Sequence, residues 1–356
     1  MLFGRTKNLV GLDIGGSSIK VVQLKDLGRG RGLQLGKLGW EPLSAEAIVD
    51  GAIMDSHLVS ETIQRLFERA GIPSSAGVAT ALSGHSVIIK RISLPAMNEA
   101  ELAESIHWEA EQYIPFAIDE VHLDYKILEG SSLSGEGQMD VLLAAAKREK
   151  INDYVGVIHQ AGLEAAVVDI AAFAMQNAFE ANYDVEGSQV VALVDIGAAV
   201  TSISVLQGGT SVYWRDINIG GNQYTDQIQK DLNLSSDQAE RLKRGEEIDG
   251  LPYERAQAIL SAVNDDVGAE IQKTLDFFKQ ISASDSPLGR LYLSGGASQI
   301  AHLKESLGER LDCQVELFNP FRKIPPAGRD ATPELINEML PTASVAVGLA
   351  LRKAGE

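Results

Sequence analysis

The 356-residue chain is long enough for about two domains, and its 45% apolar and 22% charged residues are typical of a folded globular protein. Its formal net charge of −18 disfavours nucleic acids and anionic lipid surfaces as direct partners, because both would repel an acidic protein. The single cysteine, the lack of an apolar run of about 18 residues and the short polar start predict a cytoplasmic protein without an internal disulfide, direct membrane insertion or a signal peptide.

The first two predicted strands surround a glycine-rich turn. Residues 11–18 read GLDIGGSS and lead into the apolar run 19–24, so they predict a β-hairpin. Glycines in such a turn let backbone N–H groups approach an oxyanion, and Asp13 at the strand end faces the same place. Lys20 interrupts the returning apolar run, which favours a phosphate counter-charge over a solvated edge position. We call residues 13–18 hook one, and its expected phosphate-binding residues are Asp13, Gly15, Gly16, Ser17 and Ser18.

The chain then continues through a third strand, a helix and a buried strand, in a β-β-β-α-β order. These elements are expected at 33–40, from Asp55 or Ser56 to Gly71, and at 78–82. Residues 85–165 depart from this pattern and predict a compact β-α-β-β-α insertion. Its expected strands are 87–92, 121–128 and 139–146, and its expected helices are 98–113 and 150–162.

The hook returns in the second half of the chain, where residues 193–201 read LVDIGAAVT. One such turn is common in β-proteins, but two in register indicate a duplicated fold with a phosphate chain held between the copies. The two aspartates would then face each other across a cleft and hold Mg²⁺ through water. The alternative is that each aspartate only caps its own turn. We call residues 195–200 hook two, and its expected binding residues are Asp195, Gly197, Ala198 and Ala199.

Two further glycine-rich turns are expected to border the same cleft. Strand 212–219 ends in Gly220-Gly221, and strand 291–294 runs into a second turn and a helix start. Glycines permit close approach of an adenosine to the helix entry. The residues expected at the second turn are Gly295, Gly296 and Ser298.

Three charged residues are candidates for contacts with the rest of the ligand. Glu240 and Lys243 share one helical face. There the Glu240 carboxylate could accept hydrogen bonds from ribose hydroxyls and the Lys243 stem could cover a purine, or the two could form only a solvated ion pair. Asp169 precedes a helix, where it could act as a general base or as the helix N-cap.

Two helices rich in small residues, 170–181 and 343–352, can cross with close backbones and form a hinge between two lobes. The expected fold is therefore an α/β fold of two duplicated lobes. Its expected domains are lobe one at 1–84 and 166–188, the insertion at 85–165, lobe two at 189–334 with a nested helical subdomain at about 225–289, and a closing helix at 335–356 that returns to lobe one.

The duplicated hooks, Gly295-Gly296 and the AERLK run at 239–243 resemble the actin, hexokinase and heat-shock chaperone ATPase superfamily, whose lobes are ribonuclease H-like. Longer strings narrow the resemblance to the PilM family of type IV pilus assembly proteins, which shares an FtsA-like insertion subdomain. These strings are VIIKRISLP at 87–95, WEAEQYIPF at 108–116, LDY at 123–125 and FNPF at 318–321.

The resemblance implies ATP with Mg²⁺ in the cleft, and an adaptor that docks the cytosolic N-terminal tail of a PilN-like inner-membrane protein. The tail would lie in a groove between the insertion and lobe one, and other pilus subunits and a homo-oligomer are further possible partners. Strand-edge recognition is the expected docking mode. The groove residues expected from the sequence are Ile89, Ile92 and Leu94.

Two departures from the superfamily qualify these expectations. Hook two carries only apolar side chains at 198–200, which cannot orient water, so slow or absent hydrolysis is expected. FtsA-like proteins end in an amphipathic membrane-binding helix, whereas here the closing helix is followed directly by 354–356, so attachment to the inner membrane is expected through a partner. The alternatives within this fold are a small-molecule kinase, with Asp169 as base towards a sugar hydroxyl, and a filament-forming cytoskeletal protein.

Overall fold

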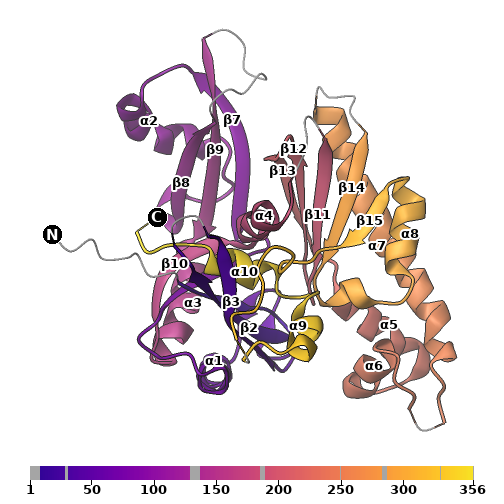
Figure 1. Ribbon diagram of the computed structural model, residues 1–356. Coiled ribbons are helices and arrows are strands. Elements are labelled where there is room, and N and C mark those ends of the chain that lie inside the picture. Colours follow the sequence, from indigo (N-terminus) through magenta and orange to yellow (C-terminus); the bar gives the residue numbers. More distant parts are fainter. Residues whose placement is uncertain are drawn as a thin grey trace.

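Two five-stranded sheets with the same strand plan frame the computed structural model (Figure 1), which describes residues 9–28, 31–128, 137–184, 189–248, 250–282, 287–328 and 330–355. In each sheet three antiparallel strands are followed by two parallel ones. The first sheet has the order β3 (Leu33–Pro42), β2 (Ser18–Asp26), β1 (Val10–Ile14), β6 (Gly77–Leu82), β10 (Glu164–Ile170). The second has the order β13 (Thr210–Ile217), β12 (Thr201–Gln207), β11 (Val190–Ile196), β14 (Leu288–Ser294), β15 (Gln314–Leu317). The repeated plan confirms the predicted duplicated, two-lobed α/β fold.

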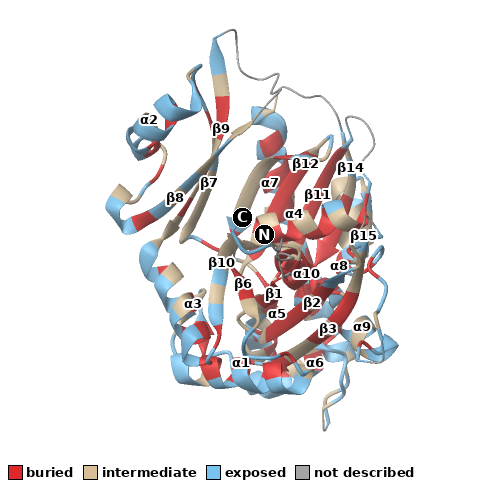
Figure 2. Cartoon of the chain, turned by 60° about the vertical axis from the view of Figure 1, so that its left-hand side comes forward, coloured by how far each residue is buried: buried red, intermediate tan, exposed pale blue. Residues whose placement is uncertain are grey.

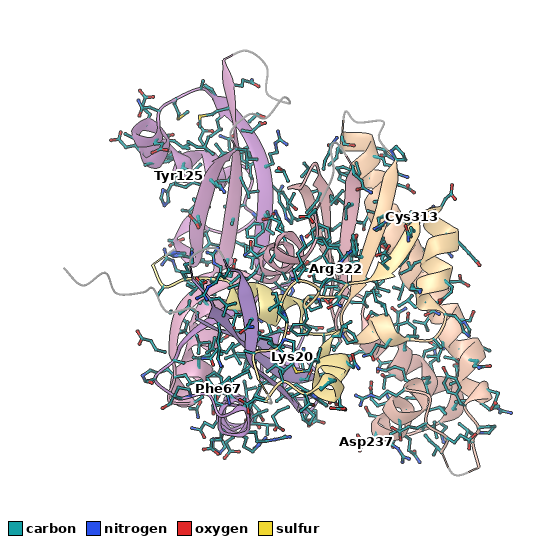
Figure 3. All side chains as sticks on the ribbon, in the orientation of Figure 1. Lys20, Phe67, Tyr125, Asp237, Cys313 and Arg322 are labelled. Atoms are coloured by element: carbon teal, nitrogen blue, oxygen red, sulfur yellow. The ribbon has the colours of Figure 1, made fainter. Side chains whose placement is uncertain are left out.

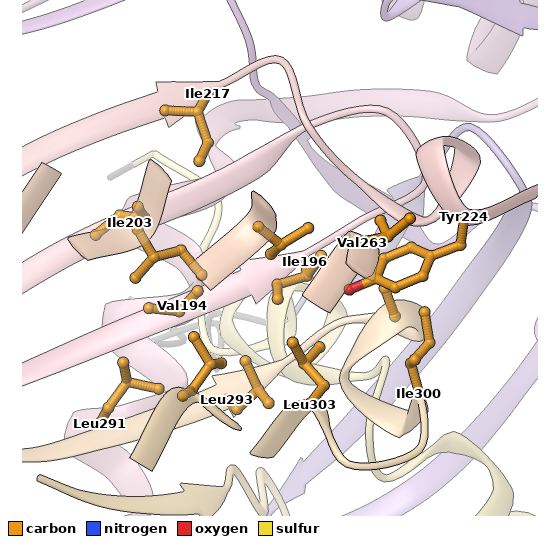
Figure 4. Packing of buried hydrophobic residues seen from close by; sticks show 14 of the residues in the cluster. Val194, Ile196, Ile203, Ile217, Tyr224, Val263, Leu291, Leu293, Ile300 and Leu303 are labelled. Carbon is orange, nitrogen blue, oxygen red and sulfur yellow. The ribbon is translucent and has the colours of Figure 1, made fainter. Parts of the chain in front are cut away.

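Helices cover the outer face of each sheet. In lobe one these are α1 (Ser56–Ala70), which starts at the Asp55 N-cap and stops at the left-handed Gly71, and α3 (Arg148–Gln160). In lobe two, α7 (Glu254–Ile281) and α8 (Leu303–Leu311) bury apolar residues against alternate positions of β11, such as Val194 and Ile196 (Figure 4). Helices α5 (Gly221–Leu232) and α6 (Ser236–Lys243) extend lobe two beyond its sheet (Figure 1).

Two helices fill the layer between the sheets, α4 (Ala171–Asn182) and α10 (Ser344–Ala350). A Cβ on Gly348 would lie 1.7 Å from the carbonyl oxygen of Ala174, and one on Gly11 would lie 2.0 Å from that of Ala346. Only glycine permits these approaches, so α4, α10 and β1 are packed backbone to backbone. The predicted close crossing is thereby confirmed. Helix α9 (Pro333–Met339) leads into this layer.

The insertion is a three-stranded antiparallel sheet of order β7 (Val87–Pro95), β9 (Gln138–Lys147), β8 (Val121–Leu128), with α2 (Glu99–Glu111) on one face. Asn98 and Glu101 form the capping box expected at the start of α2. A short turn of helix, η1 (Ile118–Glu120), precedes β8. The next helix, α3, buries Tyr154, Val157 and Ile158 in the core of lobe one, so by its packing α3 is part of lobe one and not of the insertion, where it was predicted. Figure 2 shows α2 standing outside the main body with an exposed outer face.

Among the described residues, none of the helices combines the length and the apolarity that a bilayer crossing requires.

Candidate functional site

The two hooks lie tip to tip between the lobes. Asp13 shares a strand face with Gly11, which packs on α10, and Asp195 shares one with Leu193, which lies in the core between the sheets. Both aspartates therefore point into the central layer. A Cβ on Gly16 of hook one would lie 3.7 Å from the Cβ of Ala198 in hook two. The sequence prediction that the two hooks face each other agrees with this geometry.

Lys20 stands over hook one. It is the cross-strand partner of Asp13, and its Nζ lies 3.2 Å from Asp13 Oδ2 with both side chains largely enclosed. The same Nζ would lie 3.0 Å from a Cβ on Gly15, so a glycine there leaves room for the ammonium above the turn. Figure 3 labels Lys20 on lobe one, at the side that faces lobe two. The cation is thus placed beside the N–H groups that would bind phosphate.

Asp195 is held in an unfavourable environment for a carboxylate. Burial, and then the charge of Asp13, raise its pKa, Lys20 and a hydrogen bond with Ser294 oppose the rise, and the net result is a pKa of about 6. Two carboxylates thus face one lysine, which leaves an excess negative charge that a divalent cation would offset. Within the described residues no cluster of three or more His, Cys, Asp or Glu could hold a metal unaided, so Mg²⁺ there would need water and phosphate oxygens as further ligands.

The start of α5 packs directly against hook two. The N–H of Gly221 donates to the carbonyl of Gly197 and that of Asn222 to the carbonyl of Ala198, both at 2.8 Å. A Cβ on Gly220 would lie 2.6 Å from the Ala198 carbonyl oxygen, so this position requires glycine. The Gly220-Gly221 turn therefore fixes the N-terminus of α5 against hook two.

Glu240 and Lys243 close the far side of α5. Lys243 Nζ donates to the Gly221 carbonyl at 3.1 Å and to Thr225 Oγ1 at 2.9 Å, and it pairs with Glu240. Burial raises the pKa of Glu240, but Lys243 and Thr225 outweigh it and hold that pKa below its usual range; burial lowers the pKa of Lys243. The pair is therefore a partly buried network beside hook two, and the solvated ion pair considered as its alternative does not describe it. Its contact with a nucleotide stays a prediction.

The turn after β14 borders the same place. Gly295 has a φ of 91°, and a Cβ there would lie 2.2 Å from the Ile196 carbonyl oxygen, so only glycine fits. A short helical turn, η2 (Gly296–Gln299), follows and brings the Cβ of Ala297 within 3.6 Å of a Cβ on Gly221. In the part of the chain that the structure describes, the buried hydroxyl of Ser298 has no hydrogen-bond partner. A glycine cradle with an unsatisfied hydroxyl fits a polar ligand group.

Asp169, at the end of β10, is occupied by other groups. Its Oδ1 accepts from the Ile170 N–H at 2.7 Å, and its Oδ2 lies 3.4 Å from Nε of Arg352. Burial raises its pKa, and Arg352 and the Ile170 N–H oppose the rise. The residue before α4 is Ile170, which makes no side-chain cap. A general-base role for Asp169 stays a prediction, and Arg352 is a partner that the sequence did not suggest.

The three residues expected to line a partner groove are not equivalent. Ile92 and Leu94 are each 3% exposed and lie in the core under α2, so a peptide cannot reach their side chains in this structure. Strand alternation places Ile89 on the opposite face, where it is half-buried. The expected groove set is corrected accordingly, because the sequence pattern did not reveal which face α2 covers.

One further contact joins the lobes. The N–H of Gly84, between β6 and β7, donates to Asp216 Oδ2 on β13 at 2.6 Å. A Cβ on Gly84 would lie 3.8 Å from Cγ2 of Val200, the last residue of hook two. No local signal could have found this contact, because it connects distant segments.

The comparisons agree with this architecture. Residues 11–354 match the family described as Type IV pilus assembly protein PilM. The chain is 31% identical to a protein in a solved structure titled PilM-PilN type IV pilus biogenesis complex, with a TM-score of 0.86 over 99% of this chain and 100% of that one. MreB 5 of Spiroplasma citri bound to AMPPNP is 13% identical, with a TM-score of 0.51 over 97% and 95% of the two chains, a likeness of fold alone.

Among curated proteins, the cell division protein FtsA of Bacillus subtilis is 26% identical over 261 residues, which cover 66% of this chain and 57% of FtsA. The chain thus spans little more than half the length of this relative.

Proposed function

This chain belongs to the PilM family of type IV pilus assembly proteins, and we propose that it acts in the pilus machinery as a nucleotide-binding adaptor that docks the tail of a PilN-like inner-membrane protein. The observation that carries the nucleotide part is the meeting of hook one and hook two around Asp13, Asp195 and Lys20. The partner part is supported by the relative solved as a PilM-PilN complex. Such a partner would place the protein at the cytoplasmic face of the inner membrane.

ATP with Mg²⁺ fits the chemistry of the residues that surround the cleft. Backbone N–H groups of the two hooks would bind the phosphates, with Lys20 as counter-charge. Asp13 and Asp195 would hold the metal through water, which would offset their mutual repulsion. The turn at Gly295 and the Glu240–Lys243 pair would border the adenosine. When bound, Mg²⁺ would neutralise phosphate charge.

Hydrolysis should be slow or absent in the isolated protein. Ala198, Ala199 and Val200 offer no polar side chain to orient a water molecule, and Asp169, the candidate base of a kinase, pairs with Arg352. Purified protein incubated with Mg·ATP should therefore leave most of the nucleotide intact. A turnover of about 1 s⁻¹, the low end for enzymes, would contradict this and revive the kinase alternative.

For the partner tail we propose the face of the insertion sheet that α2 leaves open. At the base of this face Val87 and Ala146 pack against the core of lobe one. Ile89 and its cross-strand neighbour Ala144 continue the same face outward and are half-buried. An apolar strip that starts at lobe one suits an extended peptide whose alternate side chains enter pockets.

The test is binding of a synthetic PilN-like tail peptide, measured by fluorescence polarisation. Ile89→Asp should weaken the binding of the peptide about tenfold or more, because a carboxylate would replace an apolar contact. Ala103→Asp, an exposed position on α2, is the matched control and should bind as the parent does. Equal peptide affinity of parent and Ile89→Asp, with both folded by circular dichroism, would remove this face from the proposal.

A further inference from the structure

Lys150 is an enclosed cation that the proposed nucleotide site does not yet use. It lies in the first turn of α3, it is 7% exposed, and burial lowers its pKa, against which Asp153 acts. Within the part of the chain that the structure describes, its ammonium has neither a hydrogen bond nor an ion pair; its near neighbour is the Tyr154 ring, 5.1 Å from Nζ to the centroid. An ammonium in a largely buried side chain, with no hydrogen bond or ion pair, is available to an anion that arrives from outside the chain.

A small hairpin connects this lysine to hook one. Strands β4 (Ile48–Val49) and β5 (Ala52–Ile53) are joined by Asp50 and Gly51, both with positive φ, which is the geometry of a tight type I′ turn. The hairpin base lies at hook one, since a Cβ on Gly16 would be 4.0 Å from the Ile48 carbonyl oxygen. Its tip lies at Lys150, whose Nζ would be 3.2 Å from a Cβ on Gly51. Glycine at position 51 thus leaves the space that the ammonium occupies.

The face of α3 that carries Lys150 lies near hook one, because the charge of Asp13 acts on Tyr154 of the same face. Burial and then the charge of Asp13 raise the pKa of Tyr154, one turn after Lys150. Asp13 itself already has Lys20 as its cation, so Lys150 is not needed to neutralise it. Lys20 stands over hook one, whereas Lys150 lies at the tip of the neighbouring hairpin.

We infer that Lys150 is a second cation of the nucleotide site and binds the terminal phosphate of a nucleoside triphosphate. This rests on the proposed nucleotide function and adds to it a means of distinguishing ATP from ADP. A lysine stem is long and flexible, so the ammonium can move from the Tyr154 ring towards a phosphate oxygen that projects past hook one. The charge-assisted contact would exist only with the triphosphate.

The experiment compares affinities for Mg·ATP and Mg·ADP by calorimetry in the parent, Lys150→Met and Lys150→Arg. Lys150→Met should weaken the binding of ATP about tenfold or more and leave the affinity for ADP within about twofold of the parent's. Lys150→Arg should retain part of the preference for ATP over ADP. Lys273→Met, which removes an equal charge from an exposed position on α7, is the matched control and should bind both nucleotides as the parent does.

A second readout separates binding from a structural role. Without nucleotide, Lys150→Met should melt at the same temperature as the parent or higher, because it removes an enclosed charge and keeps the apolar stem. Unchanged ATP affinity in Lys150→Met overturns the inference, as does an equal loss for ATP and ADP. Loss of PilN-like peptide binding with both nucleotide affinities intact would also overturn it and assign Lys150 to the partner groove. Failure of the parent to bind either nucleotide would instead refute the proposed nucleotide function.

Discussion

Replacing Asp195 by asparagine should stabilise the nucleotide-free protein while it removes a ligand of the proposed metal site. A rise of the Asp195 pKa from 3.8 to about 6 corresponds to about 3 kcal/mol of unfavourable free energy for the ionised form. This figure is an upper limit, because the Asp195 side chain is only partly buried. Asparagine keeps the shape and loses the charge, so it avoids this cost.

The pH dependence has a definite sign. Because the folded state raises this pKa, the folded protein holds the proton more tightly, and the parent loses stability as the pH rises from about 4 to about 6. The advantage of Asp195→Asn should therefore be near zero below pH 4 and complete above about pH 7. At pH 8 we expect a melting temperature above that of the parent by up to about 6–12 °C, given about 2–4 °C per kcal/mol for a domain of this size.

The assay is thermal melting of both proteins with EDTA and without nucleotide across pH 4 to 8. Asp231→Asn, at an exposed position on α5 of the same lobe, is the matched control and should show no pH-dependent gain. A gain of the same size at pH 4 and pH 8 would refute the electrostatic reasoning, since it would show an effect of packing. A loss of stability at pH 8 would refute it outright.

Two further predictions concern the crossing of α4 and α10 and the contact between Gly84 and Asp216. Gly348→Ala should lower the free energy of unfolding by about 3 kcal/mol, because its Cβ would meet the Ala174 carbonyl. Gly156→Ala, on the open side of α3, is the control and should raise the free energy of unfolding by about 0.5–1 kcal/mol. Equal chemical-denaturation midpoints of the two variants would contradict this prediction. Asp216→Ala should speed hydrogen exchange of the Gly84 amide, because it removes the acceptor of that N–H. Asp216→Asn keeps an acceptor oxygen and should preserve the protection of this amide. Unchanged exchange in Asp216→Ala would show that the contact is absent in solution.

The parts of the fold that could be predicted from the sequence are those set by local chemistry. The hairpins at the two hooks follow from glycine turns between β-branched runs, and α2 follows from the capping box of Asn98 and Glu101. The crossing of α4 and α10 could be predicted because runs of small residues indicate that two helices pack with close backbones. The position of the candidate site could be predicted in the same way, because the glycine-rich turns that surround it are visible in the sequence.

The parts that could not be predicted depend on which surfaces meet. Ile92 and Leu94 read as an apolar strand, but only the packing of α2 shows that they are core residues and that Ile89 lies on the open face. The contact of Asp169 with Arg352 and the enclosure of Lys150 involve residues that are distant in sequence from what they touch. A sequence pattern gives the face of an element but not the neighbour that covers it.

The measurement that tests the nucleotide cleft most directly is a calorimetric titration of the full chain with Mg·ATP beside the double variant Asp13→Ala, Asp195→Ala. The parent should bind, and the loss of each carboxylate should weaken binding by about 1.5–3 kcal/mol, so the double variant should show no measurable affinity while it still folds. Parental affinity in the folded double variant would contradict the assignment of the cleft.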